Sequence, residues 1–442
     1  MSRSHSRSTT LAAIVAVLVL SMAGVWTPAA YAKTRWSQRV ELQGLAAQAA
    51  NNSLKYLHTT WWNTTYAYHS VVVTKTVDTE ATETIEVANP TAGFSAGEGP
   101  VRSQASALYA TSLALRSKTY SAKAVGVGVG EANRRVIAWS NSLALSYERD
   151  HWGGGWQSPL WVYYMAFGSR QVWGSLPVST RARIGSAVAA EANGLLQWPP
   201  PYYRNPWGTV INHDDSKSEE NAWDGLLLLL AARQFPDNPH ASQWEDWGQW
   251  YCKTSYVTPN QVGSDPQIGG SNLNADGTVT NGGRPVNPDY MMTQAEFTAK
   301  SVLLSLQTKT PVCRGVFNNQ ALIWWALTKK KFPTPRYLAP GGTIYRTGAK
   351  GVVTANIYYP NGTGRSKVRK FNAAEMDVEV FASKFDKKSY DWAKAHLLAL
   401  LKQQRRHVDG KIFSNGETKF PEDEQFAACS EVEMAWRLGL MR

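Results

Sequence analysis

Carboxylates and a histidine crowd the stretch 212–223, which reads Asn-His-Asp-Asp-Ser-Lys-Ser-Glu-Glu-Asn-Ala-Trp. It stands directly before the strongly apolar segment 225–232, so its charges lie where the chain enters a core. On a helix, residues four apart share a face, which pairs Asp215 with Glu219. Paired carboxylates are what acid/base hydrolysis of a glycosidic bond requires.

Within this stretch we expect Glu220 or Asp215 to act as the general acid and Glu219 or Asp214 as the base that activates water. Asp289, far along the chain, is the alternative partner carboxylate.

Helix capping is the structural alternative for the same residues. Asp215 or Ser216 would cap the helix, Glu219 would close a capping box, and the acids would favour the helix dipole. Capping does not account for the crowding of four other residues into the same turn, which are His213, Glu220, Asn221 and Trp223.

A glycine-rich segment, His151-Trp-Gly-Gly-Gly-Trp-Gln, is the second candidate for the site. Glycines let the backbone approach a ligand closely, Trp156 can stack on a sugar ring, and Gln157 can hydrogen-bond to hydroxyl groups. A turn whose tryptophans pack inward is the alternative.

Two further segments carry polar and aromatic side chains. Tyr290, in Asn287-Pro-Asp-Tyr-Met, is the best tyrosine for a lyase base, with His213 as second base or neutraliser. A turn that caps the next helix is the alternative here. The segment 358–370 offers Tyr359, Asn361 and Arg365 as ligand contacts; an Asn-Gly turn followed by a solvated basic run is its alternative.

Apolar residues recur at three- and four-residue spacing over most of the chain, which predicts helices. The expected helical segments are 41–58, 102–117, 131–148, 159–173, 179–196, 220–234, 239–252, 289–306, 315–330, 373–385, 389–407 and 422–438. Two short β-hairpins are expected, one over 71–87 and one over 343–359. Helices in pairs with long polar loops predict a mainly α fold, an (α/α) toroid of five or six helical hairpins with these two β-hairpin insertions.

The N-terminus predicts export. Arg3, His5 and Arg7 precede an apolar run, and Ala30-Tyr-Ala fits a signal-peptidase site, so residues 1–32 are expected to be a signal peptide and 33–442 a single catalytic domain. No second apolar span follows, and membrane insertion is not expected. Of the three cysteines, Cys252 and Cys313 are the expected disulfide pair in an oxidising compartment.

Composition favours a carbohydrate partner. The chain has 19 Trp and 19 Tyr, whose flat faces stack on sugars, and its net charge of +12 favours an anionic one. Nucleic-acid motifs are absent, so a nucleic-acid partner is not expected. No cofactor and no metal are expected: no histidine pair has zinc spacing, and Gly283 stands where a calcium loop starting near Asn272 would need glutamate.

The chain resembles the secreted (α/α)-toroid carbohydrate-active enzymes, which include inverting glycosidases and the helical domains of polysaccharide lyases, and is similar to uncharacterised actinobacterial secreted proteins. The segments that carry the resemblance begin at His151, Asp215, Asn287 and Tyr358. It implies a toroid and a polysaccharide substrate. Four of this chain's loops would then meet at one mouth of the toroid.

Three functions remain open from the sequence. The leading one is a secreted or cell-wall-associated glycoside hydrolase that cleaves an acidic or cell-wall polysaccharide with its carboxylates. The second is a polysaccharide lyase that acts on a uronate polymer by β-elimination, using Tyr290 and His213. The third is a non-catalytic glycan-binding protein of the cell envelope.

Overall fold

The computed structural model describes residues 28–75, 81–92, 99–212, 215–363, 369–418, 420 and 422–441. The chain divides into two units, residues 1–41 and 42–442. The first contains the start of helix α2, and the second contains every other element. Most of the expected signal peptide lies outside the described residues. None of the described helices is long and apolar enough to cross a membrane.

The fold is mainly helical, as the apolar spacing predicts. The α-helices are α2 (Pro28–Lys55), α3 (Trp62–Thr65), α4 (Gly99–Arg116), α5 (Ala122–Val125), α6 (Val129–Asp150), α7 (Ser158–Ser169), α8 (Val178–Leu195), α9 (Ser218–Gln234), α10 (Ala241–Ser255), α11 (Pro288–Met292), α12 (Gln294–Thr308), α13 (Gln320–Thr328), α14 (Lys370–Ser383), α15 (Ser389–Gln404) and α16 (Asp423–Leu440). A π-helical segment, Tyr56–Trp61, continues α2.

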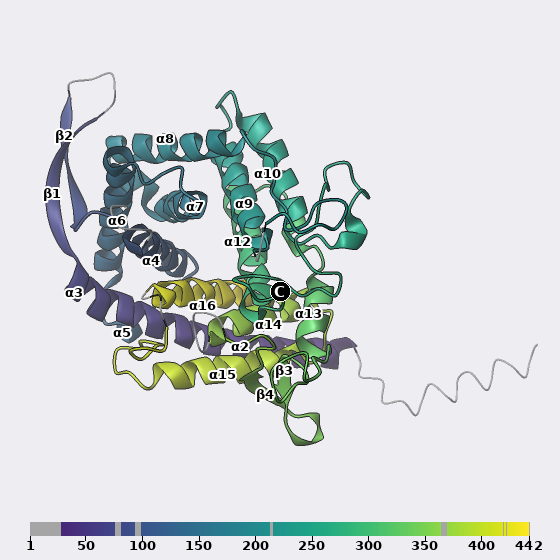
Figure 1. Cartoon of the computed structure of the whole chain (residues 1–442). Coiled ribbons are helices and arrows are strands. Elements are labelled where there is room, and N and C mark those ends of the chain that lie inside the picture. Colours follow the sequence, from purple (N-terminus) through teal and green to yellow (C-terminus); the bar gives the residue numbers. More distant parts are fainter. Residues whose placement is uncertain are drawn as a thin grey trace, which may run out of the picture. The chain divides into compact units, whose positions relative to one another are not determined.

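Two antiparallel β-hairpins interrupt the helices, where the alternating β-branched and aromatic residues predict them. The first joins β1 (Ala67–Thr74) to β2 (Thr82–Asn89) in continuous register, with Val71 opposite Ile85. It lies along α6 (Figure 1). The second joins β3 (Tyr345–Thr347) to β4 (Val353–Ile357) and contains a register shift.

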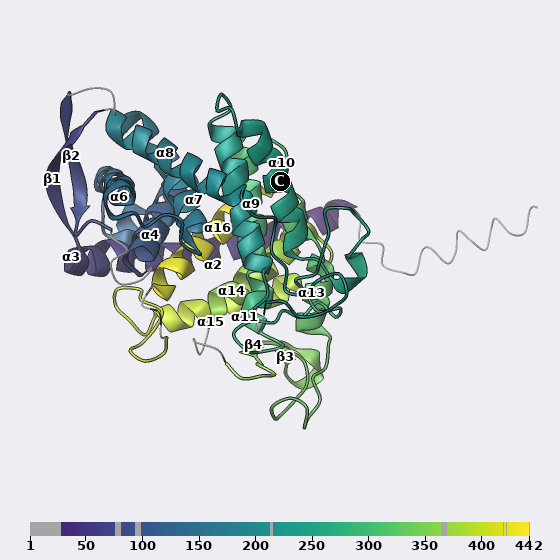
Figure 2. The same cartoon turned by 45° about the horizontal axis from the view of Figure 1, so that its top comes forward.

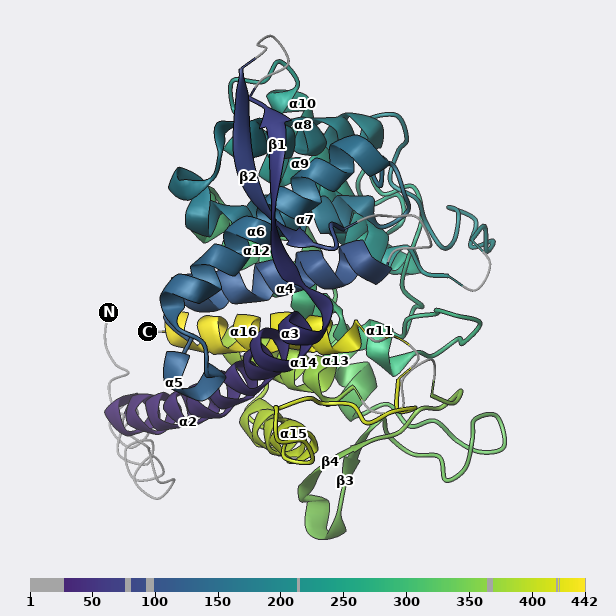
Figure 3. The same cartoon turned by 90° about the vertical axis from the view of Figure 1, so that its left-hand side faces the viewer.

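Six of the described helices contact one another in a closed cycle. Helix α4 packs on α7, α7 on α9, α9 on α12, α12 on α14, α14 on α16, and α16 on α4. The last of these contacts, which joins the two ends of the series, places α4 and α16 side by side in Figure 3. We call these six the cycle helices. Between them in the chain stand helices that pack against them from outside the cycle: α6 on α4, α8 on α7, α10 on α9 and α15 on α14 (Figure 2).

Several cycle helices are apolar or small on every side, because both their faces are covered. In α9 the run Leu226–Leu230 is buried all round, and in α7 every residue from Ser158 to Ser169 is buried. Helix α9 approaches α10 most closely at Gly225 and Gly248, where a side chain on either glycine would meet backbone or side-chain atoms of the other helix.

Apart from the helix expected over 41–58, which begins already at Pro28, two helix predictions differ from the structure. The segment expected as one helix over 289–306 is broken at Thr293 into α11 and α12. The helix expected over 315–330 begins only at Gln320, after a short 3-10 turn, Gly315–Phe317. Both differences lie at the N-terminal side of a helix, where the side-chain period alone does not fix the start.

Candidate active site

A pocket lies where the first turns of the six cycle helices meet. Its volume is about 130 Å³, which is small beside the roughly 300–1,000 Å³ of a drug-sized ligand site. Each cycle helix lines it from its first turn, with Arg102 of α4, Leu160 of α7, Glu219 of α9, Glu296 of α12, Phe371 of α14 and Phe426 of α16. Each N-terminus carries a partial positive charge of about half an elementary charge, so the arrangement favours an anionic group in the pocket.

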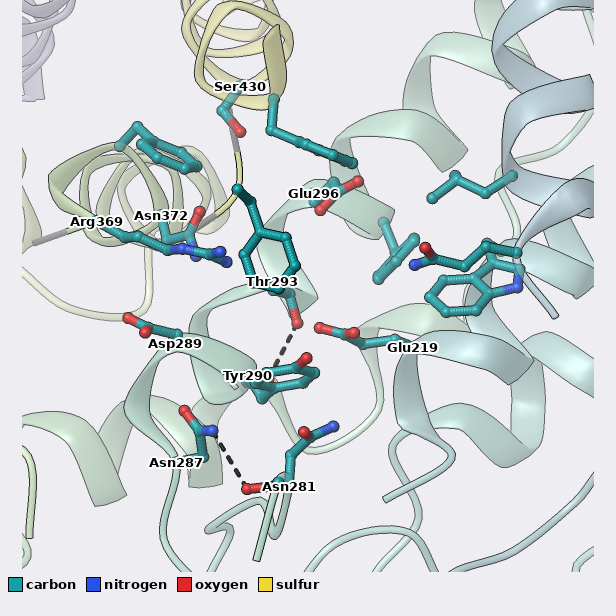
Figure 4. Close-up of a pocket in the computed structure, with 18 of the residues that line it drawn as sticks. Glu219, Asn281, Asn287, Asp289, Tyr290, Thr293, Glu296, Arg369, Asn372 and Ser430 are labelled. Carbon is teal, nitrogen blue, oxygen red and sulfur yellow. Dashed lines mark hydrogen bonds between the residues drawn. The ribbon is translucent and has the colours of Figure 1, made fainter. Parts of the chain in front are cut away.

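All four expected loops reach this pocket. Trp156 and Gln157 come from the glycine-rich segment, Glu219 and Trp223 from the acidic segment, and Asp289 and Tyr290 from the third. The fourth contributes Arg369, which lines the pocket, and the Tyr359 hydroxyl, which donates a hydrogen bond of 2.9 Å to Asp289 Oδ1. Figure 4 shows Glu219, Tyr290 and Thr293 facing one another at the centre of the pocket.

Glu219 carries the most unusual carboxyl group of the pocket. Burial raises its pKa well above the ordinary value, and the charges of Glu220 and Glu296 raise it further. Thr293 lies within hydrogen-bonding reach of Glu219. Because the Thr293 hydroxyl already donates to the Tyr290 carbonyl at 3.0 Å, its oxygen is left as an acceptor. A protonated Glu219 satisfies that oxygen, so the geometry favours the neutral acid.

Glu296, in the first turn of α12, is a pocket carboxylate that the sequence reasoning missed. Its Oε1 accepts hydrogen bonds from Lys300 Nζ at 2.8 Å and from the Tyr164 hydroxyl at 3.0 Å. The contact with Lys300 is an ion pair, so Glu296 is bound by a cation in the same pocket as Glu219. The only sequence signal was the four-residue spacing of Glu296 and Lys300 inside an apolar helix.

Glu220 points away from the place expected for a catalytic acid. Lys217 forms ion pairs with both Glu220, at 3.0 Å, and Asp215. Burial raises the pKa of Glu220 to about 7, against the opposing effect of the Lys217 ammonium. Glu220 Oε1 also accepts a hydrogen bond of 3.3 Å from Trp156 Nε1. These two carboxylates therefore hold Lys217 and Trp156, whereas Glu219 faces the pocket.

The capping alternative for the acidic segment holds only in part, because Ser216 Oγ accepts a hydrogen bond of 3.3 Å from the Ser218 backbone N–H. Helix α9 has Lys217 at its N-cap position, without a hydrogen bond from a capping side chain, and Glu219 lines the pocket. The Asn287 position precedes α11 and likewise makes no side-chain cap. Its side-chain amide instead donates to the Asn281 carbonyl at 3.4 Å (Figure 4).

Asp289 is buried on the other side of the pocket, next to a basic side chain. Burial raises its pKa, while Arg369 and the Tyr359 hydroxyl act in the opposite direction. Arg369 is itself paired with Asp423, at 3.0 Å. Figure 4 shows Arg369 and Asn372 on the side of the pocket across from Glu219.

Two more arginines line the pocket and were not expected from the sequence. The Arg102 guanidinium lies 4.3 Å from the centre of the Phe426 ring, and its Nη1 donates to Gln157 at 3.4 Å. Arg284 donates from Nη1 to the Gly282 carbonyl at 2.9 Å. With Arg369 they give the pocket three guanidinium groups, which suit a carboxylate or phosphate.

Three expected ligand contacts lie elsewhere. His151 ends α6 in the left-handed region, with φ of 48°, and borders a separate recess with Tyr147 and Arg183. Asn221 is fully buried and donates to the Pro201 carbonyl and Thr254. The Asn361 side chain accepts a hydrogen bond from the Val286 backbone. His213, Asp214 and Arg365 lie outside the described residues.

The expected disulfide is not formed: all three cysteines are free and buried. The choice of neighbours is nevertheless right, because the thiols of Cys252 and Cys313 share a hydrogen bond. Cys429 lies apart from them and donates to the Ser106 carbonyl.

Known proteins offer no assignment for this arrangement: no protein-family model, no curated protein and no solved structure matches the chain.

Proposed function

We propose that the chain is a secreted glycoside hydrolase that cleaves an acidic or cell-wall polysaccharide, and that its cycle helices form the inner layer of an (α/α)6 toroid. The alternation of cycle helices with α6, α8, α10 and α15 supports the toroid. The pocket at the meeting point of the first turns would be its mouth. The resemblance to toroid carbohydrate-active enzymes stays a prediction.

One observation carries the enzymatic assignment: two carboxyl groups of the same pocket have opposed environments, since burial and like charges raise the pKa of Glu219 while Glu296 forms an ion pair with Lys300. Environments that push two carboxyl pKa values apart are the mark of an acid and a base. Glu219, buried among like charges, keeps its proton and serves as the general acid. Glu296, paired with Lys300, serves as the base. These roles differ from the sequence expectation, in which Glu219 was a candidate base.

The proposed reaction uses these two groups directly. Glu219 donates its proton to the glycosidic oxygen as the bond to the anomeric carbon breaks. The Glu296 carboxylate takes a proton from the water that attacks that carbon. The three guanidinium groups and the helix N-termini bind the acidic substituent, while Trp156, half exposed at the rim, stacks on a sugar ring.

A lyase is the second candidate, favoured by the place of Tyr290. This phenol lines the pocket together with Arg284 and Arg369. In a lyase the arginines would neutralise the uronate carboxylate while Tyr290 removes the adjacent proton. Elimination leaves a conjugated double bond in the product, which hydrolysis does not.

One experiment separates these candidates. The mature protein is incubated with a panel of neutral and acidic polysaccharides, and reducing ends and ultraviolet absorbance are followed together. We expect reducing ends without absorbance, lost by a factor of about 10²–10⁴ in Glu219→Gln and in Glu296→Gln. Glu417→Gln, in a surface pair with Arg406, is the control that keeps full activity.

Other outcomes would replace the proposal. Absorbance that rises with the reducing ends and is lost in Tyr290→Phe would establish the lyase. Saturable binding with neither product would establish a glycan-binding protein. Full turnover in both glutamine variants would refute the acid/base assignment.

A further inference from the structure

Directly beneath the pocket lies a cluster of charges that the proposed reaction does not itself use. Lys300 of α12 has no exposed surface, and its ammonium contacts Glu296 at 2.8 Å and Glu433 of α16 at 3.2 Å. Glu375 of α14 interacts with both Lys300 and Glu433. A fully buried lysine among three carboxyl groups is unusual, because each buried ion loses its hydration.

Side chains from α4, α7, α12, α14 and α16 enclose the cluster. Lys300 Nζ lies 5.6 Å from the centre of the Tyr109 ring on α4 and 5.1 Å from that of Tyr164 on α7. The groups that face Lys300 are Glu296 and Phe297 on α12, Glu375 on α14, Cys429 and Glu433 on α16, Tyr109 on α4 and Tyr164 on α7. Screening of these charges by water is therefore weak, and they interact more strongly than charges on the protein surface do.

We propose that Lys300, balanced by Glu375 and Glu433, is the positioning residue that keeps Glu296 ionised and oriented toward the pocket. Lys300 and the Tyr164 hydroxyl both bind Oε1 of Glu296, which fixes the rotation of the carboxylate and leaves Oε2 for the pocket. The inference deepens the proposed function, on which its catalytic meaning rests.

Glu375 and Glu433 reduce the excess negative charge by sharing a proton, which leaves one uncompensated charge instead of two. With all three carboxyl groups ionised, the cluster would hold two uncompensated negative charges away from water. Burial and mutual repulsion raise the pKa of Glu375 well above its ordinary value, and burial also raises that of Glu433. A proton retained on this pair leaves the ammonium of Lys300 to Glu296, the carboxylate that reaches the pocket.

The consequence is a defined response to pH. A base must be ionised, so activity is lost at low pH, where Glu296 binds a proton. Without the Lys300 ammonium, the carboxylate of Glu296 is less stable relative to its protonated form. The fall of activity on the acid side of the pH profile, its acid limb, then moves to higher pH. A substitution that acts only through folding lowers the amount of active protein and leaves the limb where it is.

Carboxyl-carbon NMR of glutamate-labelled protein tests the inference without any substrate. The Glu296 resonance is the one missing from Glu296→Gln, and its titration midpoint is compared between the wild type, Lys300→Met and Lys300→Arg. We expect Lys300→Met to raise the midpoint by about 1–3 pH units and Lys300→Arg to restore it. Lys253→Met, which removes a half-exposed lysine paired with Asp265, is the matched control without a shift.

A second variant covers the case in which Lys300→Met does not fold. Tyr164→Phe removes only the hydroxyl that donates to Glu296, and we expect a smaller upward shift. An unchanged midpoint in every folded variant would overturn the inference. A shift in a protein that turns over no polysaccharide would uphold it and refute the proposed hydrolase instead.

Discussion

Glu219 is a candidate functional group because its burial among other carboxyl groups is unfavourable for the stability of the folded protein. It lies near Glu220, Glu296 and Asp215, and two lysines pair with these carboxyls rather than with Glu219: Lys217 with Glu220 and Asp215, and Lys300 with Glu296. We expect the folded protein to be more stable without a carboxyl group in this place. Residues of this kind are candidates for activity, since strain and unfavourable charge concentrate where chemistry needs them.

The cost of Glu219 predicts a pH-dependent gain in stability for Glu219→Gln. Its pKa is raised in the folded state, so above the unfolded pKa of about 4.3 the folded protein still holds a proton that the unfolded chain has lost. Stability therefore falls as pH rises from there to the folded pKa. The variant removes this loss, and we expect a gain in unfolding free energy of about 1–2 kcal/mol at pH 7.

Urea unfolding at pH 4 and pH 7 checks this prediction. The stability difference between variant and wild type should be near zero at pH 4 and grow toward pH 7. A difference that is the same at both values would mean that Glu219 is not protonated in the folded protein.

Trp156 provides a second prediction at the scale of one residue. Its side chain is 58% exposed, packs edge-to-face on Trp223, and is held by Glu220 through its indole nitrogen. A pre-positioned, exposed ring at a pocket rim is suited to stacking. We expect Trp156→Ala to weaken binding of an oligosaccharide about 3- to 10-fold, with little effect on folding.

Isothermal titration with an oligosaccharide that the wild type binds measures this loss. Trp325→Ala removes another tryptophan, 47% exposed on α13 and outside the pocket lining, and should leave the affinity unchanged. Equal losses in both variants would contradict a specific role for Trp156.

At the scale of elements, α9 and α10 illustrate how close packing sets the place of the acidic segment. A Cβ on Gly225 would lie 2.7 Å from Cys252 Sγ and 2.9 Å from the Gly248 carbonyl oxygen. The two helices can approach this closely only because neither has a side chain there. The contact fixes α9 two turns beyond Glu219, so it also fixes where that carboxyl enters the pocket.

Gly225→Ala is therefore expected to be strongly destabilising. Overpacking against backbone atoms typically costs about 1–3 kcal/mol or more, and here two backbone atoms of α10 would have to move. Gly44→Ala, in the exposed middle of α2 with open space around it, is the matched control. It should stabilise the protein by about 0.5–1 kcal/mol.

Thermal unfolding of both variants distinguishes the two effects. Opposite signs are expected from the same chemical change. A stable Gly225→Ala protein would show that α9 and α10 are not packed as closely as described.

The elements were largely predictable from sequence because their signals are local. The apolar spacing of each helix repeats every three or four residues, and the hairpins alternate, so each pattern fits inside its own element. The break at Thr293 was missed, because Asp289, Tyr290 and Glu296 continue the helical spacing through it. Thr293 itself keeps a right-handed helical backbone, with φ of −64° and ψ of −15°, so the interruption is slight.

The site was predictable only in part, for the same physical reason. Glu219, Tyr290 and Trp156 were found because their segments combine unusual residues within a few positions. Arg102 and Glu296 were missed, because each is an ordinary charged residue in its own helix. They lie in the same pocket because the cycle helices close through contacts between residues that are far apart in the sequence. Such contacts are not visible in the local spacing of residues.

At the scale of the whole molecule, the cysteines connect distant parts of the chain. Cys252 lies in the last turn of α10 and Cys313 precedes α13, yet their thiols are in contact. The Cys429 thiol, by contrast, lies against α4. The folded protein therefore allows one cross-link and excludes the other two.

Mild oxidation of the folded protein should join Cys252 to Cys313 and leave Cys429 free. A link across a loop of this length restricts the unfolded chain and is expected to add about 4 kcal/mol to the stability. Peptide mapping identifies the pair, and unfolding with and without reductant measures the gain. A link to Cys429 would contradict the described arrangement.

The pocket is built from the first turns of the cycle helices, and this has a consequence for how such a molecule can change. The first turn of each helix contributes side chains to the pocket, while its later turns pack against the neighbouring helices. Mutation can therefore exchange the reactive groups one helix at a time without touching the packing that keeps the helices in place. In such a protein, substitutions that change the reactive groups are separate from those that change the helix packing. Related proteins can therefore differ in substrate while they keep the same fold.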